Sequence, residues 1–175
     1  MKAIIGVLTL ALLSLIFTGT QAGPAYGDAH GEAVGCKQLA ELIAFVSEQT
    51  GRPPLQKCPR VSVTSAAALV AVVAPEASAH GAIPHTAYVV ASREILHDFD
   101  VDLATPLGRS YLVHELVHAH QFEDGTNLRA SCTGWIEGEA YRVQASYLRT
   151  HGLNRDAFAV ELLGLLQSAC GHQIP

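Results

Sequence analysis

The stretch HELVHAHQF, residues 114–122, places two histidines four positions apart, with a glutamate directly after the first. Residues four apart on an α-helix lie on one face, so His114 and His118 can direct ring nitrogens at one ion. Glu115 lies about 100° further round the helix, within reach of a water on that ion but not of the ion itself. Two neutral imidazoles beside a carboxylate are what zinc-assisted hydrolysis requires. The spacing therefore indicates a Zn²⁺ site with Glu115 as general base.

The residues around this motif favour a deeply buried helix. Thr105 and Pro106 are typical of the cap and first position of a helix, and Asp124 with Gly125 is typical of its end. Apolar residues interleave with the motif: Leu112, Val113, Leu116 and Val117. Two unpaired histidines and a carboxylate are costly to bury in such a helix, and a shared metal ion removes that cost.

A zinc site with two histidines needs a third protein ligand, which leaves the fourth position for water. Glu137 and Glu139 are the candidates, in the segment GWIEGEAYRVQASYL that is predicted to form the next helix. Residues two apart on a helix point to nearly opposite sides, so only one of these glutamates can bind the ion. Tyr141 and Gln144 share the face of Glu137, whereas Arg142 lies on the face of Glu139. The spacing by itself leaves both glutamates open.

HELVH, followed after eighteen residues by the first glutamate of WIEGEA, resembles the zinc site of the gluzincin metallopeptidases. In the aminopeptidase-type branch the third ligand follows at this interval, within a Trp-x-x-Glu-Gly-x-x-Ala-like segment. The resemblance implies a zincin-like core in which His114, His118 and Glu137 bind Zn²⁺ and Glu115 is the general base. It also implies a peptide or protein substrate. The matching part of the chain is residues 107–148.

Three departures from the gluzincin pattern bear on the third ligand and on the size of the fold. The thermolysin-like branch places its ligand glutamate directly before an alanine, which selects Glu139, followed by Ala140, instead. The aminopeptidase-type branch has an asparagine before its ligand, where this chain has Ile136. Large gluzincins carry a helical domain beyond the third ligand, and few residues follow Glu137 here. The chain resembles a minimal gluzincin core of the kind found in exported bacterial proteins, with Glu137 favoured over Glu139.

Other residues near the motif are predicted to support the site. Gln121 follows His118 by three residues and is predicted to orient it as a hydrogen-bond partner. Tyr141 and His151 are the candidates for stabilising a developing oxyanion. Tyr141 is better placed because it follows Glu137 by one helical turn. Packing in the core is the alternative role for Tyr141.

The other histidines of the central region are not predicted to bind metal. His120 follows His118 by two residues, about 200° round the helix, so it cannot share the ion. It is predicted to lie at the surface or to cap the end of the helix. His80, His85 and His97 stand in or beside predicted loops, where no spacing favours a shared ion.

The first residues of the chain predict export. Lys2 precedes an apolar run at 3–17, and small residues follow up to Ala22, which is the pattern of a signal peptide over residues 1–22. The alternative is a single-span membrane anchor. The run is shorter than the ~20 apolar residues that a span needs, and no basic cluster follows it. A secreted or periplasmic protein without a membrane anchor is therefore predicted.

The four cysteines fit this compartment. An even number in an exported chain favours disulfides over free thiols, and the close spacing of a zinc knuckle is missing. The pairs Cys36–Cys58 and Cys132–Cys170 are favoured because each stays within one half of the chain.

Composition and periodicity predict one α+β domain. Eleven basic residues against sixteen acidic ones give a formal net charge of −5 without a basic run, so nucleic acid is excluded as an expected partner. Residues 23–32 are predicted to be disordered and 33–175 to form a single zincin-like domain. Helices are predicted for 34–50, 66–74, 106–123, 135–151 and 154–169, and strands for 60–65, 87–91 and 93–99. The helix at 66–74 is expected to be buried, because it is apolar throughout.

Together these features predict an exported zinc-dependent hydrolase, specifically a metallopeptidase. The alternative is a zinc-binding domain without turnover, which serves as a binding or sequestering module. Glu115 argues for the hydrolase, because metal storage needs no carboxylate at that position. A disulfide-bonded helical domain without metal would leave His114 and His118 unexplained in a buried helix.

Overall fold

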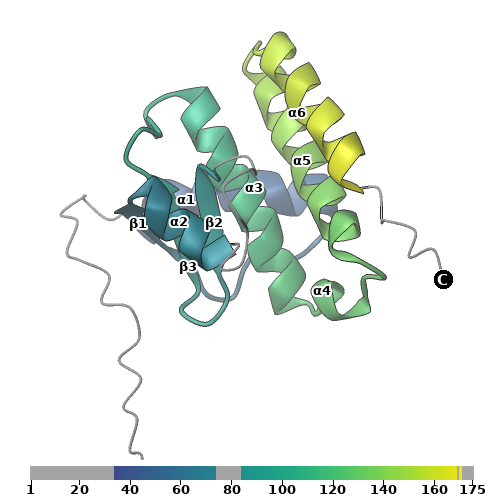
Figure 1. Cartoon of the computed structure of the whole chain (residues 1–175), viewed down its shortest axis with the longest axis horizontal. Coiled ribbons are helices and arrows are strands. Elements are labelled where there is room, and N and C mark those ends of the chain that lie inside the picture. The colour runs from purple at the N-terminus through teal and green to yellow at the C-terminus, as the bar shows by residue number, and fades with distance from the viewer. Residues whose placement is uncertain (1–33, 74–83, 169, 171–175) are drawn as a thin grey trace, which may run out of the picture.

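The computed structural model describes residues 34–73, 84–168 and 170. The predicted signal peptide, the segment 23–32 and His80 lie outside this part. The elements run in the order α1 (Cys36–Thr50), β1 (Arg60–Thr64), α2 (Ala66–Val73), β2 (Thr86–Val89), β3 (Glu94–Asp98), α3 (Pro106–Glu123), α4 (Thr126–Arg129), α5 (Thr133–Thr150) and α6 (Asn154–Ser168). A small sheet stands beside a mainly helical body, which confirms the predicted α+β class (Figure 1).

The sheet is mixed, in the order β1-β3-β2, with β1 parallel and β2 antiparallel to β3. Successive strand residues point to opposite faces, so paired Ala87 and Leu96 pack with Leu69 of α2 on one face. Val61 and Ile95, which are also paired, join the core formed with α1 and α3 on the other face. Figure 1 shows α2 in front of the strands and α1 behind them. This order places β1 and β2 at the two edges of the sheet, and β2 is the edge strand beside α3.

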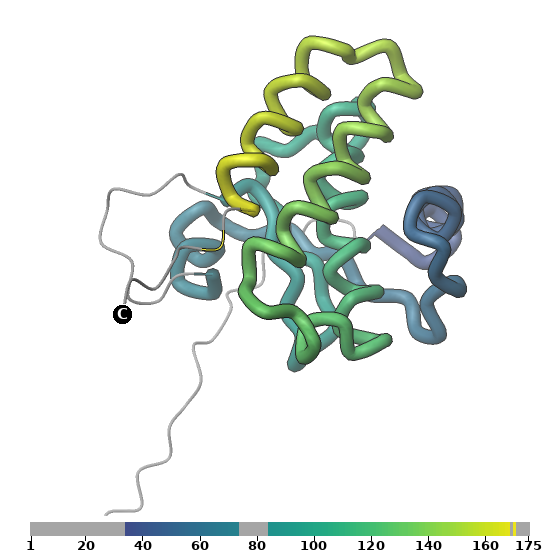
Figure 2. Tube along the Cα trace, turned by 90° about the vertical axis from the view of Figure 1, so that its right-hand side faces the viewer, coloured from purple at the N-terminus to yellow at the C-terminus, as the bar shows by residue number. Residues whose placement is uncertain are grey.

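Helix α3 is the central element, because it lies between the sheet and α5 (Figure 2). Its predicted cap is confirmed: the Thr105 hydroxyl accepts a hydrogen bond from the Gly108 N–H at 3.0 Å, and Pro106 occupies the first turn. A Cβ at Gly108 would lie 1.9 Å from the Asp102 carbonyl oxygen, so only glycine fits this close approach. The four apolar residues interleaved with the histidine motif are fully buried: Leu112, Val113, Leu116 and Val117. A helix held on several sides gives its polar side chains fixed positions.

Helices α5 and α6 form an antiparallel pair on the outer side of α3 (Figure 1). The positions of α6 that face α5 are small, and a Cβ at Gly164 would come within 2.7 Å of the Tyr141 Cβ. Phe158, Leu165 and Leu166 of α6 are exposed on its outer face. The close approach to Gly164 fixes Tyr141 on α5.

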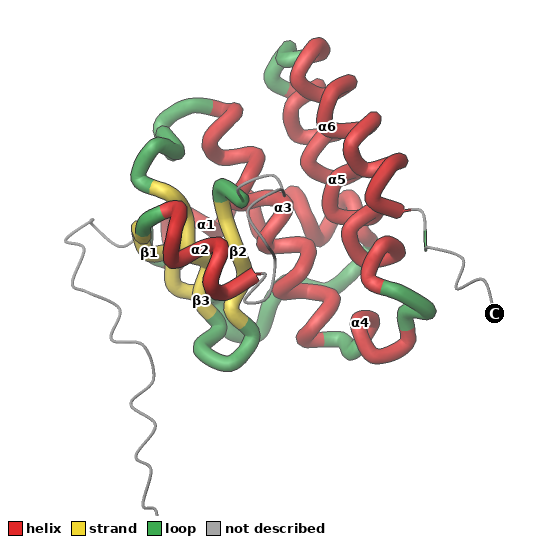
Figure 3. Tube along the Cα trace, viewed as in Figure 1, coloured by secondary structure: helices red, strands yellow, loops and turns green. Residues whose placement is uncertain are grey.

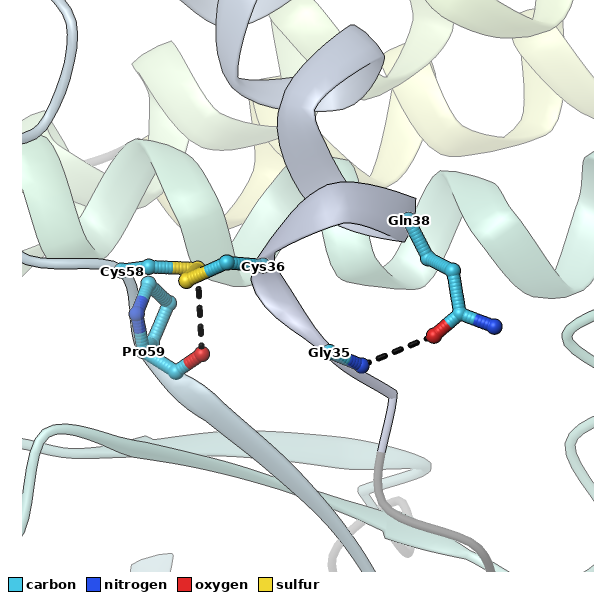
Figure 4. The surroundings of a disulfide bond; sticks show 5 residues. All are labelled: Gly35, Cys36, Gln38, Cys58 and Pro59. Atoms are coloured by element: carbon cyan, nitrogen blue, oxygen red, sulfur yellow. Dashed lines mark hydrogen bonds between the residues drawn. A yellow bond between two sulfur atoms is a disulfide. The ribbon is translucent and has the colours of Figure 1, made fainter.

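Both predicted disulfides are confirmed. Cys36–Cys58, with a Cα–Cα distance of 5.7 Å, ties the start of α1 to the segment before β1 (Figure 4). Cys132–Cys170, at 5.9 Å, joins the start of α5 to the chain after α6. Such bridges persist in oxidising compartments, as expected for an exported protein. Among the described residues, no helix combines the length and the apolar character needed to cross a membrane.

Two predictions about the elements need correction. The described part of the segment predicted at 66–74 is helical, Ala66–Val73, but it is not buried as a whole: Leu69 is buried, whereas Val73 is exposed, because the sheet covers α2 on one side. The segment between α3 and α5, for which no helix was predicted, contains the short helix α4 (Figure 3). Gly125, in the left-handed conformation with φ 72°, ends the preceding turn and lets this helix begin.

Candidate metal centre

Helices α3 and α5 bring the three predicted ligands together. His114 Nε2 lies 3.1 Å from His118 Nε2. Glu137 Oε2 lies 3.3 Å from His114 Nε2, and Glu137 Oε1 lies 3.3 Å from His118 Nε2. Ligand atoms bound to one tetrahedral zinc at about 2.0–2.1 Å are about 3.3 Å apart, so these separations are close to those that zinc requires.

The three ligands differ in their access to solvent. His114 and His118 are each 8% exposed, whereas the Glu137 side chain is 30% exposed. The site is therefore walled by α3 and open beside Glu137. An open side is what distinguishes a reactive zinc site from a closed structural one.

A glutamine fixes the ring of His118. The His118 Nδ1 lies 2.8 Å from the Gln121 Oε1, as the three-residue spacing predicted. The Gln121 amide nitrogen donates to the Ile136 carbonyl and to the Glu139 carboxylate, both at 2.9 Å. Both partners are acceptors only, so the amide nitrogen must face them and the amide oxygen must face His118. His118 Nδ1 is consequently the donor, and in the neutral ring Nε2 presents a lone pair to the other ligands.

A second glutamine fixes the ring of His114 in the same way. The His114 Nδ1 lies 3.2 Å from the Gln144 Oε1, and the Gln144 amide nitrogen donates to the Ser110 hydroxyl at 3.2 Å. That hydroxyl donates in turn to the Leu107 carbonyl at 2.7 Å. Sequence reasoning placed Gln144 on the face of Glu137 but did not assign it to His114. The signal that could have identified this role is the spacing of Gln144, two helical turns past Glu137 on the same face of the helix.

Two imidazole lone pairs and a carboxylate directed at one point repel one another unless a cation lies between them. In the metal-free protein a proton on His118 supplies this positive charge. Burial opposes charging His118, but the hydrogen bond with Glu137 and the charges of Glu115 and Glu137 prevail and raise the pKa of His118 to about 9. Burial also raises the pKa of Glu137, but the hydrogen bonds with His114 and His118 outweigh it and hold that pKa well below its usual range. The site therefore attracts positive charge.

Glu115 lies beside the ligands and is held by the sheet. The residue is 5% exposed, and its Oε1 accepts a hydrogen bond from the Thr86 hydroxyl at 2.8 Å. Thr86 begins β2, the edge strand next to α3. Glu115 is not one of the three converging ligands. Sequence reasoning missed Thr86, because no local pattern relates residues 29 positions apart.

Of the two candidates for an oxyanion stabiliser, the structure places Tyr141 at the site. Its ring packs against His114, with the centroids 4.5 Å apart. Burial, together with the charges of Glu137 and Glu115, raises the pKa of Tyr141 to about 12, so its hydroxyl keeps its proton at neutral pH. His151 is exposed at the far end of α5, where it packs against Tyr147 at 4.3 Å.

The alternative ligand Glu139 points away from the three converging residues. Its carboxylate pairs with Arg52 at 2.8 Å and accepts from Gln121 at 2.9 Å. Arg142 lies 3.8 Å away on the same face, as predicted. In the described chain, the group of residues able to hold a metal contains Glu137 and not Glu139.

The expected surface position of His120 is wrong. The residue is 3% exposed, and its Nε2 has no hydrogen-bond partner within the described residues. Helix α3 is covered by α1, the sheet and α5, so it has little free surface to offer this side chain. At the helix end it is the His120 backbone carbonyl that accepts from the Asp124 N–H at 3.0 Å. Burial lowers the pKa of His120, which keeps the ring neutral.

The two other described histidines of this region are not part of the group formed by His114, His118 and Glu137. His85 is exposed and packs against Tyr111 with centroids 5.2 Å apart. His97, in β3, has its Nδ1 2.9 Å from the Asp98 carbonyl oxygen.

The chain belongs to the family described as Domain of unknown function (DUF6647), whose model matches residues 32–174. No curated protein and no solved structure matches it. The family description states no activity, so the function has to be argued from the site itself.

Proposed function

We propose that this protein is a zinc-dependent hydrolase, a metallopeptidase of the gluzincin type that acts on peptide or protein substrates. His114, His118 and Glu137 are the zinc ligands, and Glu115 is the general base. The observation that carries the proposal is the convergence of two imidazole nitrogens and a carboxylate within 3.3 Å of one another. The glutamines behind both rings support it, because they commit each Nε2 lone pair to the same point.

The donor set fits zinc. Two imidazole nitrogens and one carboxylate oxygen are the ligands of many hydrolytic zinc sites, which keep the fourth position open. His114, His118 and Glu137 would hold the zinc ion, which would supply a bound water with a pKa lowered to about 7 and polarisation of a substrate carbonyl. The exposure of Glu137 supports access of a substrate from that side.

The side chains around the proposed ligands support a role in hydrolysis. Thr86 occupies one oxygen of the Glu115 carboxylate and so fixes its plane. The second oxygen, Oε2, remains to accept a proton from water, which is the role of a general base. Tyr141, protonated at neutral pH, can donate a hydrogen bond to an oxyanion formed beside His114.

Replacing Glu115 with glutamine tests this function and separates it from the zinc-binding module without turnover. Glutamine keeps the size of the side chain but cannot accept a proton, so hydrolysis should fall by about 10²–10⁴-fold. The assay is cleavage of a library of internally quenched peptides and peptidoglycan fragments. Zinc content is measured on the same samples by mass spectrometry. Glu48→Gln, an exposed position on α1, is the matched control and should behave like the wild type.

Each outcome of this experiment decides between the two functions. Cleavage by the wild type and by Glu48→Gln, but not by an equally zinc-loaded Glu115→Gln, is the expected result. If all three bind zinc and none cleaves, the protein is the sequestering module. If Glu115→Gln cleaves as fast as the wild type, Glu115 is not the base and the gluzincin mechanism does not operate.

A further inference from the structure

Glu139, the glutamate that points away from the ligands, has a structural relation to the metal centre through Gln121. We propose that Glu139 is a positioning residue: it fixes the amide of Gln121 and thereby the tautomer and orientation of the zinc ligand His118. This inference rests on the proposed zinc site and deepens it, by assigning a residue outside the ligand set.

The hydrogen bonds around Glu139 leave its carboxylate no freedom. Arg52 donates to both of its oxygens, at 2.8 Å and 3.0 Å, in a bidentate pair. The Gln121 amide nitrogen donates to one of them at 2.9 Å. Arg52 is itself held from the other side by Asp124, at 2.8 Å. Bidentate arginine–carboxylate pairs are geometrically strict, so the oxygen offered to Gln121 has a fixed place.

The charge of Glu139 selects the productive orientation of the amide. Turning the amide of Gln121 by half a rotation would set its oxygen against two acceptors, the Glu139 carboxylate and the Ile136 carbonyl. It would also direct the amide nitrogen at His118 Nδ1, which would then have to accept. The neutral ring would carry its hydrogen on Nε2, 3.1 Å from the His114 Nε2, where a zinc ligand needs a lone pair.

The two histidines are supported unequally. The chain behind His114 ends in neutral groups, the Ser110 hydroxyl and the Leu107 carbonyl. The chain behind His118 ends in the charged pair Arg52–Glu139, which lines a cavity of about 580 Å³ that Glu137 does not line. A change at Glu139 therefore acts on one of the two histidines only.

The competing explanation is that Arg52–Glu139 only ties the end of α1 to α5. Two variants separate the explanations. Arg52→Met breaks the ion pair but leaves the Glu139 oxygen in reach of Gln121. Glu139→Ala removes the ion pair and the hydrogen bond to Gln121 together. The conservative Glu139→Gln keeps an acceptor oxygen for Gln121 and serves as the rescue. Glu161→Gln is the matched control, because it breaks a different ion pair, with Arg149.

The test is the zinc dissociation constant of the full chain with both disulfides formed, measured by competition with a chromophoric chelator. Glu139→Ala should weaken zinc binding by about 10–100-fold, the effect typical of losing an outer partner of a ligand histidine. Glu139→Gln should recover most of the affinity. Glu161→Gln should bind zinc as the wild type does, and Arg52→Met, which loosens the carboxylate but keeps its oxygen in reach of Gln121, should lose clearly less affinity than Glu139→Ala. Adding Glu139→Ala to Gln121→Leu should cost no more affinity than Gln121→Leu alone, because Glu139 acts on His118 only through Gln121.

A second readout follows the tautomer directly. In zinc-loaded protein, the Nδ1–H signal of His118 in histidine-ring NMR spectra should be sharp in the wild type and in Arg52→Met, and exchange-broadened in Glu139→Ala. If Glu139→Ala binds zinc as tightly as the wild type, or Arg52→Met loses as much affinity as Glu139→Ala, Glu139 is not a positioning residue. A wild-type chain that binds no zinc overturns the proposed function as well, so the two failures are distinguishable.

Discussion

Thr86 holds the general base of the proposed mechanism, and Thr86→Val removes that support while keeping the shape of the side chain. The lost hydroxyl donates to the Glu115 Oε1 at 2.8 Å. The two residues are 9% and 5% exposed, so water has little room to replace the donor. A hydrogen bond to a charged group contributes about 1.5–3 kcal/mol, and the carboxylate left behind keeps its desolvation penalty. We expect the free energy of unfolding to fall by about 2–3 kcal/mol.

Urea unfolding followed by circular dichroism measures this loss. Thr64→Val is the matched control: Thr64 is also 9% exposed, in β1, and makes no side-chain hydrogen bond within the described part of the chain. The control should change stability by less than about 0.5 kcal/mol, and Thr86→Ser, which keeps the hydroxyl, should recover most of the loss. Zinc content should be the same in all variants, because Glu115 is not a ligand. If Thr86→Val lowers the free energy of unfolding no more than Thr64→Val does, the hydrogen bond from Thr86 does not hold Glu115 in place, and the proposed positioning of the general base is wrong.

Three further predictions concern the fold and the charge of the site. Gly164→Ala should lower the free energy of unfolding by about 1–3 kcal/mol, because its Cβ would press on Tyr141; unchanged urea unfolding would contradict the close packing of α5 on α6. Thiol titration of the unreduced, denatured protein should find no reactive cysteine, and each bridge should contribute about 2–4 kcal/mol; reactive thiols would contradict the pairing. The pKa of His118, raised from 6.5 to about 9, stabilises the metal-free protein below pH 6.5, and this contribution is lost as the pH rises through 9. The thermal unfolding midpoint of the metal-free protein should therefore fall from pH 7 to pH 9, while the affinity for zinc rises. A metal-free protein whose midpoint rises over this range would refute the raised pKa of His118.

That His114 and His118 lie together could be predicted because helical spacing is local. His114 and His118 share one face of α3 through their four-residue separation, and the Thr105 cap fixes where that helix starts. Gln121 follows from the same periodicity, since it is one turn past His118. Glu137 lies on a second helix, so the periodicity of α3 could not relate it to the histidines. The resemblance to the gluzincins favoured Glu137 over Glu139, which spacing alone had left open.

The partners from other elements could not be predicted, because nothing in the local sequence relates them. Thr86 reaches Glu115 across 29 positions, and Arg52 reaches Glu139 across 87. The burial of His120 was missed for a related reason: the polar residues of α3 suggest a free face, but neighbouring elements cover it. Packing of distant segments decides these contacts, and it overrides the pattern of a single helix.

The zinc content of the purified chain, compared with that of Glu137→Ala, tests the central claim most directly. Glu137 is partly exposed, so its replacement should leave the fold intact, as circular dichroism can verify. Mass spectrometry of the dialysed proteins should find one zinc per wild-type chain and a small fraction of that in Glu137→Ala. A folded Glu137→Ala with full zinc content, or a wild-type chain that retains none, would contradict the proposed metal centre.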